Sequence, residues 1–172
     1  SAGSVSSAPD THPRLDPATL TFVGTGLVRP ECVLATRDGN LFTADWRGGV
    51  AQIRADGTQA LYVGTLPGGR ALRPNGIALR RDGTFLLADL GETAGGVFAL
   101  GRDGRVEPFV VEVDGVELPP TNFVFEDDRD RVWITVSTRR VPRAAAYRAD
   151  VADGFIVLVD ERGARIVADG LG

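Results

Sequence analysis

The sequence has very few of the residues on which much enzyme chemistry depends. Its 172 residues include one cysteine, Cys32, and one histidine, His12, which lies in a polar N-terminal segment. A single cysteine excludes an intramolecular disulfide and a thiolate metal cluster. The shortage of both residue types also argues against a Ser-His-Asp or Cys-His catalytic device and against a zinc site. A metal bound by this chain would therefore be a hard cation held by oxygen atoms.

Long hydrophobic runs and lysine are also missing. No apolar stretch approaches the roughly 20 residues that a transmembrane helix needs, so the sequence predicts no membrane partner. All 19 basic residues are arginine, and 23 acidic residues bring the formal net charge to -4. This acidic balance argues against nucleic acid or an anionic membrane as a partner. The hydrophobic share of 43% is typical of a globular domain.

The strongest pattern in the chain is an internal repeat. Residues 29–45 have the sequence RPECVLATRDGNLFTAD, and residues 73–89 have RPNGIALRRDGTFLLAD. The two segments align without a gap at a spacing of 44 residues (75 − 31 = 44). A third copy, TNFVFEDDRDRVWITV, covers residues 121–136, where Asn122 falls 47 residues after Asn75 (122 − 75 = 47). Periods of about 20–50 residues indicate solenoids, propellers or arrays.

Each copy predicts four short strands. A first apolar strand is followed by an Asp-Gly or Asp-Arg-Asp turn, a second strand, a link, a third strand, another polar turn and a fourth strand. The strands are rich in Val, Leu, Ile and Phe, and no segment has a sustained helical stripe. Four strands in a unit of about 45 residues is typical of a β-propeller blade. A β-sandwich with chance similarity between its hairpins is the alternative, which the gapless match disfavours.

We therefore predict an all-β fold, a six-bladed β-propeller of which this chain supplies three four-stranded blades plus one leading outer strand. The predicted boundaries are a flexible tail at 1–19, the outer strand at 20–26, and blades one to three at 27–66, 67–113 and 114–172. Because propellers have about 4–8 blades, three blades leave the ring open and expose apolar faces. We expect a second polypeptide or fragment to supply the remaining blades. A homodimer of half-rings is less favoured, because the leading strand would compete with the fourth strand of blade three.

Three oxygen-bearing side chains occupy one equivalent position in the repeat. Glu31, Asn75 and Asn122 open the first strands, which line the central channel of a propeller. Side chains at equivalent points of neighbouring blades converge near the axis, and carboxylate and amide oxygens suit Ca²⁺ or a similar cation. We therefore favour Glu31 and Asn122 as metal ligands. For Asn75 a place in the wall of a substrate site and a turn formed with Gly76 both remain open.

Several other polar and aromatic residues have structural interpretations. Asp45 and Asp89 recur after the second strands, where an aspartate is more often a hydrogen-bond acceptor in a turn than a catalyst. Trp46 and Trp133 are predicted to be packing residues. Cys32 follows Glu31 on a channel strand and is predicted to be a small buried apolar residue.

The link between the second and third strands of blade three is longer than its counterparts. It runs from residue 137 to 154 and contains Arg139, Arg140 and Tyr147. Long loops are commonly functional or disordered. These three side chains are therefore candidates for contact with an anionic or polar substrate. A solvated charge cluster folded over the end of the ring is the alternative.

The quoted motifs, together with GFIVLVDERGARIVADGLG at residues 154–172, resemble the SMP-30/gluconolactonase/LRE-like superfamily. Strictosidine-synthase-like and paraoxonase-like propellers are its relatives. The resemblance covers about residues 20–172 and implies a six-bladed propeller with one divalent cation, most often Ca²⁺, at its axis. It implies a hydrolase for lactones or related esters as small-molecule substrates.

The resemblance also implies roles for two residues. Glu31 matches the glutamate ligand of blade one, and Asn122 matches the blade-three asparagine at or beside the metal and substrate. The other family ligands, including the aspartate that is the usual candidate for general base, belong to later blades. A catalytic base is therefore not assigned in this chain. The alternative function is a non-hydrolytic propeller, either a ligand-binding scaffold or a strictosidine-synthase-like condensing enzyme.

Overall fold

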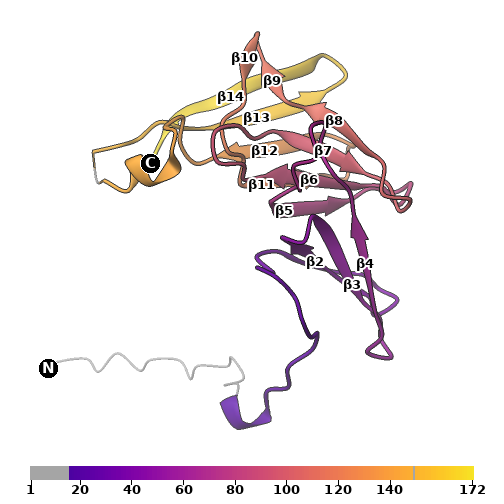
Figure 1. Cartoon of the computed structure of the whole chain (residues 1–172). Helices are drawn as coiled ribbons and strands as arrows, with labels where there is room; N and C mark the ends of the chain where they lie inside the picture. The colour runs from indigo at the N-terminus through magenta and orange to yellow at the C-terminus, as the bar shows by residue number, and fades with distance from the viewer. Residues whose placement is uncertain (1–15, 149) are drawn as a thin grey trace, which may run out of the picture.

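The computed structural model describes residues 16–148 and 150–172, and His12 lies outside these ranges. The described chain is nearly all β and forms three four-stranded antiparallel sheets of consecutive strands, together with one two-stranded hairpin. The sheets stack in chain order, from the indigo sheet at the bottom of Figure 1 to the yellow one at the top. This arrangement confirms the all-β class and the three four-stranded blades.

The strands follow the predicted repeat closely. Blade one contains β1 (Val33–Ala35), β2 (Leu41–Asp45), β3 (Gly49–Ile53) and β4 (Gln59–Val63). Blade two contains β5 (Pro74–Leu79), β6 (Phe85–Asp89), β7 (Val97–Leu100) and β8 (Val106–Val110). Blade three contains β11 (Phe123–Glu126), β12 (Val132–Val136), β13 (Gly154–Asp160) and β14 (Gly163–Leu171). Between blades two and three lies the hairpin of β9 (Glu112–Val113) and β10 (Val116–Glu117), and the described 3-10 helices are η1 (Pro17–Thr19) and η2 (Arg143–Ala146).

The recurring Asp-Gly pairs form the tight turns that the repeat predicts. The carboxylates of Asp56 and Asp82 each accept a hydrogen bond from the backbone N–H two residues later, at 2.9 Å in both turns. The glycines that follow, Gly57 and Gly83, have φ values of 84° and 86°, a conformation that glycine adopts without steric strain. Hydrogen bonds from Thr58 to Asp56 and from Thr84 to Asp82 hold the pKa of both carboxyl groups below its usual value.

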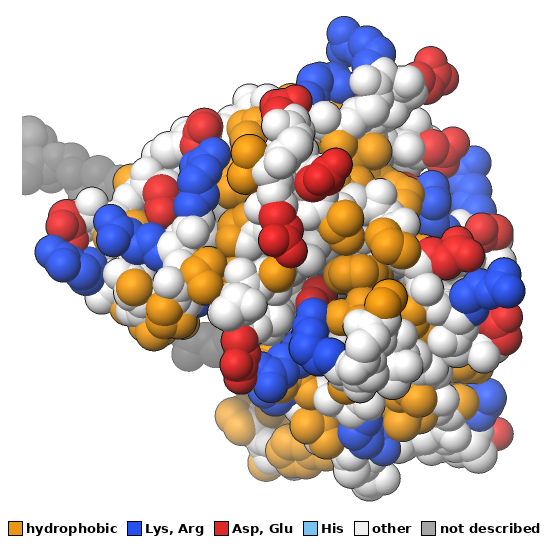
Figure 2. Space-filling model, turned by 45° about the horizontal axis from the view of Figure 1, so that its top comes forward, with side chains coloured by type: hydrophobic (Ala, Val, Ile, Leu, Met, Phe, Trp, Pro, Cys, Tyr) orange, Lys and Arg blue, Asp and Glu red, His pale blue; other side chains and the backbone are white. Residues whose placement is uncertain are grey.

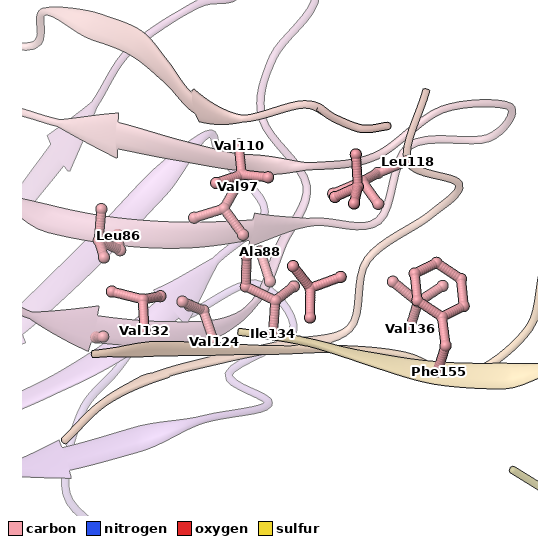
Figure 3. Close-up of a cluster of buried hydrophobic side chains, with 13 residues drawn as sticks. Leu86, Ala88, Val97, Val110, Leu118, Val124, Val132, Ile134, Val136 and Phe155 are labelled. Atoms are coloured by element: carbon pink, nitrogen blue, oxygen red, sulfur yellow. The ribbon is translucent and has the colours of Figure 1, made fainter. Parts of the chain in front are cut away.

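The core lies between the blades, because each strand sends alternate side chains to opposite faces of its sheet. Blade two shows both sides of this alternation. Leu86 and Ala88 belong to the cluster shared with blade three, which Figure 3 shows in close-up. Phe85 and Leu87 belong to the cluster shared with blade one, where the Phe85 ring lies 5.6 Å from that of Phe42. Blade two is therefore covered on both faces.

The first strands of neighbouring blades meet closely. The backbone N–H of Gly76 in β5 donates to the carbonyl oxygen of Asn122, just before β11, at 2.9 Å. A Cβ atom at Gly76 would lie 2.6 Å from the Cα of Phe123, so glycine is required for this approach. On the other side, Cys32 packs against the cluster between blades one and two and is only half-buried, less than predicted.

The outer faces of blades one and three carry exposed hydrophobic side chains. In blade one these are Val33, Leu61 and Val63, with exposed fractions of 61%, 38% and 40%. In blade three Phe123 and Phe125 are 41% and 54% exposed. Figure 2 shows a patch of hydrophobic side chains on one face of the molecule, bordered by arginine and acidic side chains. Such patches mark surfaces that contact another partner.

The outer strand predicted at 20–26 stays a prediction, because the blade that it would complete is not among the described residues. This segment has no strand pairing, and Phe22 is almost fully exposed. It lies instead against blade one, where Thr25 and Gln59 exchange hydrogen bonds of 2.8 and 3.0 Å. A strand forms only beside an edge that accepts its hydrogen bonds, and the described residues do not offer the edge that the prediction assumed. The other predicted boundaries contain the blades as the structure has them, and the tail at 1–19 falls largely outside the described residues.

The described helices are single short 3-10 turns, and none of them is long and apolar enough to cross a membrane.

Candidate functional site

The predicted site residues lie at one end of the blades. Because the strands of each blade are antiparallel, the starts of the first strands share an end with the links between the second and third strands. We call this the site end, and it includes the links at 46–48, 90–96 and 137–153. The Asp-Gly turns lie at the opposite end. The site end therefore holds Glu31, Asn75 and Asn122 together with the long link of blade three.

Asn122 joins blades two and three through its backbone. Its carbonyl oxygen accepts hydrogen bonds from the N–H of Gly76 at 2.9 Å and from the side-chain Nδ2 of Asn75 at 2.8 Å. Its own side-chain oxygen, Oδ1, is enclosed and has no hydrogen-bond partner among the described residues. An enclosed acceptor without a partner is unfavourable in free energy. Asn122 Oδ1 therefore fits a ligand that offers a cation or a hydrogen-bond donor.

Asn75 lies in strand β5 and not in a turn. The register of β5 against β6 is interrupted between Pro74 and Ile77, so Asn75 occupies a β-bulge. Bulges re-aim side chains, and here the Asn75 amide is directed to the Asn122 carbonyl. Asn75 is therefore placed to hold Asn122 in position, and the turn interpretation with Gly76 does not apply.

Glu31 is paired with a neighbouring arginine. Its Oε1 atom accepts from Nη2 of Arg29 at 2.9 Å, and the two side chains are 42% and 53% exposed. The Arg29 guanidinium stacks 4.3 Å from the centre of the Trp46 ring. A cation that binds Glu31 must therefore compete with Arg29 for the carboxylate.

The site end contains few oxygen donors from charged side chains. No group of three or more His, Cys, Asp or Glu side chains is placed to hold a metal ion in the part of the chain that the structure describes. The Glu31 carboxylate and the enclosed amide oxygen of Asn122 are oxygen atoms of the kind that hard cations prefer, and both lie at the site end. Hard cations take six or more oxygen ligands, so further donors would have to come from water, substrate or other blades.

Asp45 and Asp89 have the structural role that their repetition predicts. Both are fully buried. Asp45 accepts from the N–H of Val28 and from the Arg47 side chain, whose two hydrogen bonds are 2.9 and 2.8 Å long. Burial opposes ionisation of Asp45, but the hydrogen bonds from Arg47 and Val28 and the charge of Arg47 together lower the pKa of the carboxyl group.

Asp89 repeats this arrangement in blade two. It accepts from the N–H of Arg73 at 2.9 Å and from the side chain of Arg70 at 2.7 Å. Each aspartate thus fixes the chain just before its channel strand.

The two tryptophans make structural contacts through hydrogen bonds, and neither belongs to the buried hydrophobic clusters among the described residues. Trp46 donates its Nε1–H to the carbonyl oxygen of Pro74 at 3.0 Å and so connects blade one to the residue before Asn75. Trp133 donates to Asp127 at 3.0 Å, and this bond, together with those from Arg131, lowers the pKa of Asp127. Neither indole is placed as a reacting group.

The substrate candidates of the blade-three link occupy different surroundings. Arg139 pairs with Asp169 through hydrogen bonds of 2.7 and 3.1 Å, and its guanidinium lies 4.3 Å from the centre of the Phe155 ring. These contacts hold the Arg139 side chain within blade three. Arg140 is exposed, and its backbone N–H donates to Thr138. Tyr147 is 77% exposed at the end of η2. The structure does not bring these three side chains together around one pocket.

Sequence reasoning missed a groove at this end. It lies between the link of blade two and the link of blade three and is lined by Arg73, Glu92, Val141 and Arg143, among others. Arg73 lies two residues before Asn75, and Arg143 lies in the same link as Arg139 and Arg140. The two arginines line one groove only because the long link folds across blade two. A local pattern carries no signal of such a contact.

Comparison with proteins of known structure shows which fold this chain has. No family model matches the sequence, and no curated protein matches it significantly. A gluconolactonase from Xanthomonas campestris has a similar structure, with a TM-score of 0.56 and 19% sequence identity over 77% of this chain and 44% of that one. The chain folds as part of a β-propeller.

A second similar structure is a catalytically inactive virginiamycin B lyase from Staphylococcus aureus with quinupristin. Its TM-score is 0.53, with 14% identity over 84% of this chain and 42% of that one. The chain therefore spans less than half the length of either propeller. At these identities the similarity shows the fold alone, and the activities of the two proteins remain their own.

Proposed function

We propose that this chain is part of a metal-dependent hydrolase that acts on lactones or related esters. The observation that carries the proposal is the enclosed, unpartnered Oδ1 atom of Asn122 at the site end. The Glu31 carboxylate at the equivalent position of blade one supports it, as does the structural similarity to a gluconolactonase. The cation we propose is Ca²⁺, which prefers oxygen ligands.

The residues of this chain have separate tasks in the proposal. Glu31 and Asn122 would hold the cation, and Asn75 keeps Asn122 oriented through its bond to the Asn122 carbonyl. A cation at Glu31 would replace Arg29 as the partner of the carboxylate, and the Arg29 side chain is 53% exposed. A bound divalent cation supplies polarisation of the substrate carbonyl and stabilisation of negative charge on its oxygen.

The overall reaction is the addition of water to the acyl carbon of the substrate. The water oxygen forms a bond to the carbonyl carbon, the bond from that carbon to the ring oxygen breaks, and the ring oxygen takes a proton. The product is a hydroxy acid. A general base would accept the proton that water loses. We assign no described residue to that role.

Further blades complete the site in this proposal. The exposed apolar faces of blades one and three and the coverage of only 44% and 42% of the two similar propellers support a ring that contains more blades than these three. We propose that a second polypeptide, or a further segment, covers both faces and contributes the missing oxygen ligands.

A second candidate function is a metal-free binding propeller. The pairing of Glu31 with Arg29 at 2.9 Å favours it, because the carboxylate already has a cationic partner. In this alternative the site end binds a small polar molecule without hydrolysing it.

Lactone hydrolysis by the chain combined with its remaining blades separates the two functions. We expect turnover of a panel of lactones that stops with EDTA and returns with Ca²⁺. Glu31→Gln should lower the bound metal and the rate together, whereas Glu161→Gln, a control at an exposed glutamate in the turn between β13 and β14, should leave both unchanged. Turnover that EDTA does not affect would exclude the metal mechanism, and absence of turnover with Ca²⁺, Mn²⁺ or Zn²⁺ would favour the binding propeller.

A further inference from the structure

The structure assigns a second binding site at the site end, a groove for the carboxylate of a small organic acid. It has a volume of about 390 Å³ and lies between the β6–β7 link of blade two and the 137–153 link of blade three. Arg73 and Arg143 line it, with Glu92 at the same groove and with Leu90, Val141 and Pro142 as apolar walls. The inference rests on this groove alone and does not require the proposed hydrolysis.

Arg73 is held in place but is only weakly paired. Its Nη1 atom lies 3.4 Å from Oε1 of Glu92, a carboxylate whose side chain is 79% exposed. The guanidinium is positioned 5.5 Å from the centre of the Trp46 ring, and its backbone is fixed by Asp89. A long contact to an exposed carboxylate contributes little free energy, so an incoming anion can replace Glu92 as partner of Arg73.

Arg143 has even fewer hydrogen-bond partners than Arg73. Its Nε atom is enclosed and has no hydrogen-bond partner among the described residues, and its Nη2 atom makes one 3.4 Å contact with Ser137. An enclosed guanidinium N–H without a partner is unfavourable, and arginine binds carboxylates through two parallel N–H donors. Arg143 lines the groove and has no carboxylate partner among the described residues, so the rest of its guanidinium is available to an anion there.

Two other arginines near this groove have close carboxylate partners. Arg70 pairs with the buried Asp89 at 2.7 Å, and Arg139 pairs with Asp169 through two bonds. At the groove itself, Arg73 has only the 3.4 Å contact with Glu92, and Arg143 has no carboxylate partner among the described residues. The two positive charges against the single exposed charge of Glu92 leave the groove with a net positive charge.

The walls of the groove define the class of ligand. Leu90 is 8% exposed at the base of the link, while Val141 is 45% exposed and adjoins Pro142. Small-molecule sites combine mostly apolar walls with a few placed polar groups, in volumes of about 300–1,000 Å³. A monocarboxylate with an apolar body fits this lining better than a free phosphate, which would leave the apolar walls uncovered.

Calorimetric titration of the full chain with benzoate tests the inference, with neutral benzamide as the matched ligand control. We expect benzoate to bind and benzamide to bind at least tenfold more weakly. Arg143→Gln and Arg73→Gln should each weaken benzoate binding about tenfold, as expected for loss of a charged hydrogen bond. Glu92→Gln should strengthen it, because the competing carboxylate is removed.

Arg148→Gln is the control variant, since Arg148 lies in the same link but pairs with Asp150 outside the groove. It should bind benzoate as the unchanged chain does, and circular dichroism should show that all variants are folded. Equal binding of benzamide, or benzoate binding that neither arginine substitution weakens, would overturn the assignment. Absence of benzoate binding at millimolar concentration would overturn it as well.

Discussion

Blade two and its two neighbours have the same strands but different surfaces. Within the described residues, the strands of blades one and three carry eight large hydrophobic side chains that are exposed, whereas β5 to β8 of blade two carry none. These eight are Val33, Leu61, Val63, Phe123, Phe125, Ile166, Val167 and Leu171. The repeat therefore specifies a blade with two apolar faces, and only the middle blade has both of them covered. This difference shows that the fold is stabilised mainly by packing between neighbouring blades.

The largest expected effect is the loss of a core leucine from the middle blade. Leu86 is fully buried between blades two and three, and Leu86→Ala should lower the free energy of unfolding by about 2–5 kcal/mol. The matched substitution Leu61→Ala, at a side chain that is 38% exposed on blade one, should change it by less than about 1 kcal/mol. Urea unfolding followed by circular dichroism measures both values. Equal losses would contradict the difference between the blades.

The next largest loss of stability is expected where β5 of blade two contacts the start of β11 in blade three. Gly76→Ala puts a Cβ atom 2.6 Å from the Cα of Phe123, which forces the two channel strands apart. We expect a loss of about 1–3 kcal/mol in the same unfolding experiment, in the range found for overpacked sites. The bond from Gly76 to Asn122 should weaken with it, which faster amide hydrogen exchange at residue 76 would show. Unchanged exchange at that amide would argue against close contact between these two strands.

Acid should have its largest effect on blade three. Hydrogen bonds from Trp133 to Asp127, and from Arg165 to Asp160, lower the pKa of these blade-three carboxyl groups below the usual 3.8. A pKa lowered by folding contributes stability above the unfolded value, and this contribution is lost as the pH falls through the folded value. Stability should therefore hold from neutral pH to about pH 4 and fall below it.

Tryptophan fluorescence can show whether the loss of stability in acid occurs in blade three. Trp46 reports blade one and Trp133 reports blade three, so Trp46→Phe leaves a signal from blade three alone. We expect an emission shift below about pH 4 in that variant. Asp127→Asn should reduce the shift, since it removes the titrating partner of the indole. A shift of the same size in Asp127→Asn would show that other groups control the acid response.

The smallest effect on stability, and a clear effect on the surface, is expected at Phe125. Its side chain is 54% exposed on the outer face of blade three, so Phe125→Lys should alter unfolding by less than about 1 kcal/mol. It should reduce the binding of a hydrophobic dye such as anilinonaphthalene sulfonate and raise solubility. Loss of folding in this variant would mean that the face is needed within the chain itself.

The sequence allowed the blades and the corner aspartates to be predicted, because both depend on local patterns. Alternating apolar residues and Asp-Gly turns placed every strand of the three blades. The recurrence of Asp45 and Asp89 indicated that both accept structural hydrogen bonds, although only Asp45 accepts one within its own turn. The segment at 20–26 could not be placed this way, since a strand needs a partner edge that no local pattern supplies.

The site was predictable only in part. The equivalent positions of Glu31, Asn75 and Asn122 followed from the repeat. The ion pair of Glu31 with Arg29 and the bulge at Asn75 did not, because both depend on local backbone geometry that the motif leaves undefined. The groove between Arg73 and Arg143 is a contact between distant segments, and the fold of the long link decides it.

The central claim is that further blades cover the outer faces of blades one and three. Native mass spectrometry of the material purified without denaturant tests it most directly. We expect the 18.2 kDa of this chain to occur with about an equal mass of additional polypeptide, joined to it or bound to it. A stable, monodisperse 18.2 kDa monomer that exposes both apolar faces would contradict the claim.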